Sequence, residues 1–75
     1  MHRYRNSSGE SGVVAYDIDA GSITIQFSGG DRYLYTDSSA GAENIARMQE
    51  LAQEGRGLST FVSQQIRSRY ARKLN

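Results

Sequence analysis

The chain has 75 residues, of which 37% are hydrophobic and 23% are charged, which is enough for one small domain and not for two. Cysteine is absent, so a chain this short has to form its core by packing alone, without disulfide bonds. The apolar runs are far shorter than the roughly 20 residues that span a bilayer, which excludes a transmembrane helix.

The net charge of +1 is unevenly distributed along the chain. Residues 1–54 contain four arginines and all eight acidic residues, for a net charge of −4. Residues 55–75 contain no acidic residue and carry a charge of +5. These five basic residues are Arg56, Arg67, Arg69, Arg72 and Lys73. The sequence therefore predicts a positively charged C-terminal end.

Residues 1–11 form a polar segment that is rich in serine and glycine and contains the single histidine, His2. We expect this segment to be a disordered lead-in, with Tyr4 inside it, and residues 12–75 to form the single domain. Alternatively, Tyr4 forms an accessory basic arm together with Arg3 and Arg5. Arg3 and Arg5 are not followed by an apolar segment, so the N-terminus does not resemble a secretory signal and a cytoplasmic location is expected.

Three segments with two-residue periodicity follow, each rich in β-branched and aromatic residues: 13–18, 23–27 and 32–36. The connections at 19–22 and 28–31 contain Asp, Gly and Ser, which suit tight turns. The pattern predicts a three-stranded antiparallel meander.

The register of the second hairpin decides where Tyr33 and Tyr35 point. A two-residue Gly29-Gly30 turn leaves both tyrosines on the face that the helices do not cover. A three-residue loop at 28–30 pairs Ile25 with Tyr33 and turns both rings inward. We expect the inward arrangement, because so small a core needs the two rings.

After residue 39 the apolar period becomes helical, with a stripe formed by Ile45, Met48, Leu51 and Ala52. Gly55 is a natural left-handed cap for this helix. Ser59 is expected to cap a second helix that runs to about Arg72, with Phe61, Val62, Ile66 and Tyr70 on its apolar side. The predicted fold is α+β, with two helices packed on one face of the meander.

Several short motifs resemble those of the KTSC family, small domains found as single bacterial proteins and at the C-terminus of some lysyl-tRNA synthetases. The similarity covers roughly residues 12 to 70. Tyr33 and Tyr35 match the central Y-x-Y of the family, Gly57 the glycine before its second helix, and Ile66, Arg67 and Tyr70 its closing I-R-x-x-Y. Ser38-Ser39 stand where the family usually has Val-Pro, and Val62-Ser63 where it tends to have Phe-Asn. The resemblance implies RNA binding as a proposed role. Because the core is small, we expect five of these motif residues to be mainly structural: Tyr33, Tyr35, Gly57, Ile66 and Tyr70.

The sequence indicates a protein that is not an enzyme. The only imidazole lies in the lead-in, which excludes a catalytic triad, and zinc ligands are lacking. Asp17-x-Asp19-x-Gly21 begins like a calcium loop, but Ser22 and Ser28 stand where its glycine and glutamate belong. Neither a metal nor a small-molecule cofactor is expected.

Arg69, Arg72 and Lys73 are spaced to lie together on a helix, with Arg67 nearby, and Arg56 precedes the second helix. Arginines suit bidentate phosphate contacts, so the leading hypothesis is weak RNA or tRNA binding through these five residues. Alternatively, the basic side chains are solvated and only complement the dipole at the C-terminal end of the helix. The protein is then a protein-interaction or self-association module that uses the open sheet face or an edge strand. If Tyr33 and Tyr35 are buried, their rings cannot stack on bases, and only phosphate contacts are left for RNA binding.

Overall fold

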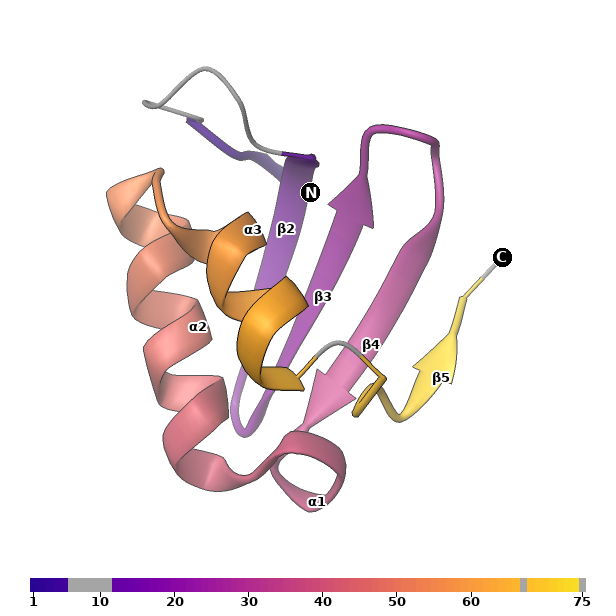
Figure 1. The fold of residues 1–75 in the computed structure, drawn as a ribbon, viewed down its shortest axis with the longest axis vertical. Helices are drawn as coiled ribbons and strands as arrows, with labels where there is room; N and C mark the ends of the chain where they lie inside the picture. The colour runs from indigo at the N-terminus through magenta and orange to yellow at the C-terminus, as the bar shows by residue number, and fades with distance from the viewer. Residues whose placement is uncertain (6–11, 67, 75) are drawn as a thin grey trace.

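The computed structural model describes residues 1–5, 12–66 and 68–74. Its centre is an antiparallel sheet of five strands, whose spatial order is the same as their order in the chain. The strands are β1 (His2–Arg3), β2 (Val13–Asp19), β3 (Ser22–Phe27), β4 (Arg32–Thr36) and β5 (Arg72–Lys73). Figure 1 shows β2 to β5 lying side by side. The α+β class is confirmed, but the sheet has two more strands than the predicted meander.

The three central strands lie where the two-residue periodicity predicts them. In the second hairpin Ile25 pairs with Tyr33 and Ile23 with Tyr35. The Phe27 N–H donates to the Asp31 carbonyl at 2.8 Å, which closes a loop over residues 28–30. Directly opposed residues point to the same face, so both tyrosines share the face of the buried isoleucines. The inward arrangement is confirmed.

The predicted disorder of the lead-in is wrong for residues 1–5. His2 pairs with Tyr16 and Arg3 with Ala15, and the Tyr4 N–H donates to the Val14 carbonyl. Tyr4 is only 3% exposed. The reason is tertiary: the free edge of β2 supplies hydrogen-bond partners, and the phenol ring gains a buried site. Residues 6–11 lie outside the described residues.

The first predicted helix is α2 (Ala42–Glu54). A short helix that was not predicted, α1 (Asp37–Ala40), precedes it, and Gly41 separates the two. Thr36 and Ser39 form a reciprocal capping box that starts α1. The predicted stripe of α2 is buried, and the helix ends at Gly55 in the left-handed conformation, with φ of 80°.

The second predicted helix is much shorter than expected. It consists of α3 (Leu58–Phe61) and a π-helical turn, η1 (Val62–Ile66), and it does not reach Arg72. Its N-cap is Gly57 and not Ser59, because the helix already begins at Leu58. The Leu58 N–H donates a hydrogen bond to the Tyr4 hydroxyl. Beyond η1 the chain returns to the edge of β4, where the N–H groups of Ala71 and Leu74 donate to the carbonyls of Leu34 and Arg32. This edge pairing outweighs the helix propensity of the sequence.

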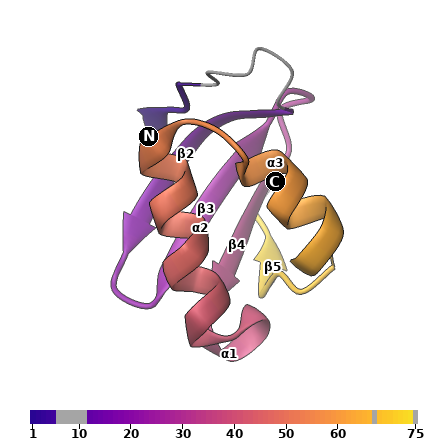
Figure 2. The ribbon, with the colours of Figure 1, turned by 60° about the vertical axis from the view of Figure 1, so that its left-hand side comes forward.

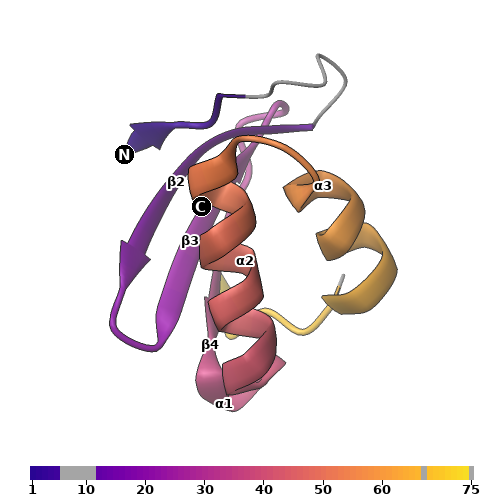
Figure 3. The same cartoon turned by 90° about the vertical axis from the view of Figure 1, so that its left-hand side faces the viewer.

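The helices cover one face of the sheet, as expected, and the core lies between the two layers (Figures 2 and 3). Its largest fully buried side chains are Val13, Ile23, Ile25, Tyr35, Ile45, Met48, Leu58 and Ile66. We call the opposite face of the sheet the open face.

Candidate functional site

The predicted basic cluster is not a feature of one helix. Arg56 lies in the turn between α2 and α3, and Arg69 follows η1. Arg72 and Lys73 lie in β5, while Arg67 lies outside the described residues. The prediction assumed that the second helix continues to about Arg72. Because the helix ends at Ile66, helical spacing does not bring Arg69, Arg72 and Lys73 together.

Within β5 the two basic side chains point to opposite faces of the sheet. Lys73 pairs with Tyr33 and shares its helix-covered face, whereas Arg72 pairs with Leu34 and lies on the open face. The Lys73 Nζ atom lies 3.5 Å from Asp31 Oδ1 and 5.9 Å from the centroid of the Tyr33 ring. Lys73 therefore lies beside Tyr33 on the helix-covered side and not with Arg72 on the open face.

The open face brings Arg72 together with two arginines that the sequence interpretation did not select. Arg3 pairs with Ala15, Ala15 with Gln26, and Gln26 with Arg32, so Arg3 and Arg32 end one row across four strands. Arg72 lies on the neighbouring row. All three side chains are exposed. We call Arg3, Arg32 and Arg72 the arginine face.

The outward position of Arg32 could have been predicted from the alternation of β4, because a residue next to the inward Tyr33 must point to the opposite face. Arg3 gave no such signal, since nothing in its two-residue strand predicts pairing. Among the described residues, neither Arg3 nor Arg72 forms an ion pair. Asp17 and Asp19 also lie on the open face, in β2 and away from Arg32 and Arg72.

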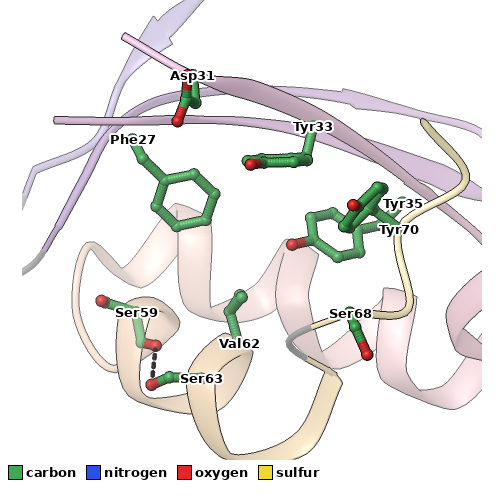
Figure 4. A pocket seen from close by; sticks show the side chains of 9 residues that line it. All are labelled: Phe27, Asp31, Tyr33, Tyr35, Ser59, Val62, Ser63, Ser68 and Tyr70. Atoms are coloured by element: carbon green, nitrogen blue, oxygen red, sulfur yellow. Dashed lines mark hydrogen bonds between the residues drawn. The ribbon is translucent and has the colours of Figure 1, made fainter. Parts of the chain in front are cut away.

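On the helix-covered side, a cavity of about 440 Å³ opens between the sheet and the segment formed by α3 and η1 (Figure 4). We call it the aromatic cavity. Its lining residues are Phe27, Asp31, Tyr33, Tyr35, Ser59, Val62, Ser63, Ser68 and Tyr70.

The motif tyrosines form the inner wall of the aromatic cavity. Tyr35 is 1% exposed, and its burial, together with the neighbouring Tyr33 and Tyr70 phenols, raises its pKa to about 12. The Tyr33 and Tyr70 ring centroids lie 4.7 Å apart. Tyr70 was expected in the core on the second helix, but it follows the helix and is 39% exposed at the rim.

The motif residues Gly57 and Ile66 lie at the two ends of the segment formed by α3 and η1. Gly57 has φ of 82°, a left-handed conformation that starts α3. Ile66 is 1% exposed and packs in the core at the end of η1.

Comparison with protein families, curated proteins and solved structures finds no match to this chain. The resemblance to the KTSC family therefore stays a prediction. Of the described helices, none is long and apolar enough to cross a membrane. Over the same part of the chain, no three His, Cys, Asp or Glu side chains are grouped to hold a metal ion.

Proposed function

We propose that the protein is a non-catalytic binding module that holds the phosphate backbone of single-stranded RNA on the open face of its sheet. The observation that carries this proposal is the arginine face, which three strands from distant parts of the chain assemble. Arg56 and Arg69 lie outside the sheet, so they take no part in the proposed binding.

The spacing of the arginine face suits an extended polyanion better than a single small anion. Arg3 and Arg32 are separated by three strand intervals, or about 14 Å. Arg32 and Arg72 are diagonal neighbours on adjacent strands, so one ligand can contact both guanidinium groups. Guanidinium groups also bind phosphate oxygens through paired N–H donors, so the cluster gains most from a ligand with several phosphates.

Base stacking has no place in this proposal. Tyr33 and Tyr35 point to the helix-covered side, and the open-face positions of the described strands hold no aromatic residue. The side chains between the arginines are Ala15, Gln26, Thr24 and Leu34. We therefore expect binding that is weak, sensitive to salt and largely independent of base sequence.

The decisive experiment is a titration with a short oligouridine, followed by NMR at several salt concentrations. Three phosphate contacts predict a slope of about −2 for log affinity against log salt. Replacing Arg3, Arg32 or Arg72 singly by Gln should reduce the slope by about 0.7 each. Amide shifts should concentrate on β1, β4 and β5, which carry the three arginines.

Two matched variants remove one charge elsewhere. Arg47→Gln alters an exposed arginine of α2, which forms an ion pair with Glu50, and Arg56→Gln alters the turn before α3. Neither should change the slope. A loss that is equal in all five variants would show a general charge effect and reject the arginine face.

The alternative proposal, a protein-interaction or self-association module, has weaker support from the sheet edges. Both edges end in two-residue strands that carry Arg3 on one side and Arg72 and Lys73 on the other. Short, charged edge strands oppose pairing with another chain. A concentration-dependent mass in sedimentation experiments, with no response to RNA, would favour this alternative.

A further inference from the structure

The aromatic cavity is lined by rings that pack against one another at steep angles. Phe27 and Tyr33 lie 5.8 Å apart at 69°, and Tyr35 and Tyr70 lie 6.3 Å apart at 89°. Figure 4 shows Tyr33 above the space, Phe27 and Tyr70 on two sides and Val62 below. The rings come from β3, β4 and the segment after η1, so this arrangement depends on the complete fold.

The electrostatic character of the cavity favours a cation. Aromatic faces carry the negative part of the ring quadrupole. The Asp31 side chain lines the same space, and among the described residues that line it none is basic. In Figure 4 a carboxylate oxygen of Asp31 points toward the rings.

A cation of the protein already occupies the rim. Lys73 Nζ is 5.9 Å from the Tyr33 centroid and 3.5 Å from Asp31 Oδ1. Both side chains of this ion pair are about half exposed, at 45% for Lys73 and 50% for Asp31. The Lys73 ammonium can therefore exchange with another cation at little cost, because an exposed ion pair contributes little stability.

We propose that the aromatic cavity binds a small quaternary ammonium group, such as the trimethylammonium head of choline or of trimethyl-lysine, in competition with Lys73. A quaternary ammonium has no N–H groups to leave unpaired, and it is attracted to ring faces. A primary ammonium keeps its hydration and stays at the rim, as Lys73 does. A volume of about 440 Å³ is in the lower part of the range for small-ligand sites, which suits a head group of this size.

The first test compares choline with 3,3-dimethyl-1-butanol, its uncharged analogue of the same shape. In an NMR titration, choline should shift the signals of Phe27, Tyr33 and Tyr70 and bind several-fold more tightly than the alcohol. Equal binding of the two compounds would show a merely apolar cavity, and the absence of shifts would show no site. Either result overturns the proposal.

The variants give effects of opposite sign. Tyr33→Leu and Asp31→Asn should each weaken choline binding by about 2- to 30-fold. Lys73→Gln should strengthen it, because the variant removes the competing cation and keeps the side-chain length. Strengthening cannot arise from a damaged fold, so unchanged or weaker binding by Lys73→Gln rejects the competition.

A matched aromatic control is Tyr16→Leu, which removes a ring that contacts His2 at 5.6 Å and does not line the cavity. It should leave choline affinity unchanged. A trimethyl-lysine peptide and free choline then distinguish the source of the head group by their relative affinities. Arg72→Gln should not affect either ligand, so this test is independent of RNA binding.

Discussion

At the scale of single residues, Tyr4 connects the N-terminal strand to the start of α3. Its ring is buried, and its hydroxyl accepts a hydrogen bond from the Leu58 N–H at 3.2 Å. Tyr4→Phe keeps the ring but leaves this buried N–H without its partner, so we expect a loss of about 1–3 kcal/mol in the free energy of unfolding. Urea denaturation measures it. An unchanged midpoint would mean that water replaces the hydroxyl.

Gly55 depends on its lack of a side chain for two reasons. Its φ is 80°, and a Cβ atom there would lie 2.4 Å from the Arg5 Cβ. Gly55→Ala should therefore cost about 1–2 kcal/mol for the left-handed backbone, with the displacement of Arg5 in addition.

Gly29→Ala is the matched control for Gly55→Ala, because a Cβ atom at Gly29 meets nothing within 4 Å. Thermal unfolding of both variants should place the control within about 0.5 kcal/mol of the parent. Equal losses in the two variants would refute the explanation.

At the scale of elements, the segments with strong local patterns were predictable. The alternation around Ile23, Ile25 and Tyr33 predicts β3 and β4, and the need of a small core for the two tyrosine rings decides their register. The stripe from Ile45 to Ala52 with the Gly55 cap predicts α2. β1 and β5 were not predictable, because two-residue strands have no period and form only when an edge is available. The end of the last helix at Ile66 was missed for the same reason.

β5 is therefore the element whose contribution is most useful to measure. A chain that ends at Tyr70 loses the Ala71–Leu34 and Leu74–Arg32 hydrogen bonds. We expect the free energy of unfolding to fall by about 1–3 kcal/mol, and the amide of Leu34, whose backbone faces β5, to exchange faster with solvent. Identical exchange in the two chains would show that β5 is not docked in solution.

At the scale of the whole molecule, the charge difference between residues 1–54 and 55–75 predicted only part of the arginine face. Of the five predicted basic residues, Arg72 lies on the arginine face, while Lys73 pairs with Asp31 on the other side. Arg3 and Arg32 belong to the part with net negative charge, so a count along the sequence conceals them. Only the pairing of strands shows which charges share a surface.

The stability of the whole molecule should depend on pH in the alkaline range through Tyr35. Its folded pKa is about 12, whereas an unfolded tyrosine ionises near 10. The unfolded state therefore loses the proton first, and stability falls as the pH rises from about 10 through about 12, by roughly 2–3 kcal/mol.

Denaturation curves measured up to about pH 12 test this prediction for Tyr35, with Tyr35→Phe as the control. The phenylalanine variant lacks the ionising group, so its stability should decline less over that interval. An equal decline in both proteins would assign the effect to other groups.

The order of the strands has a consequence for the time course of folding. β2, β3 and β4 are joined by short turns and can pair as soon as they are made, whereas β5 reaches β4 only after the helices between them. Pairings that are distant in sequence form late. The aromatic cavity, whose outer wall carries Tyr70 and whose rim carries Lys73, should thus be completed in the last step of folding. Brief detachment of β5 would reopen the cavity while the rest of the core stays intact.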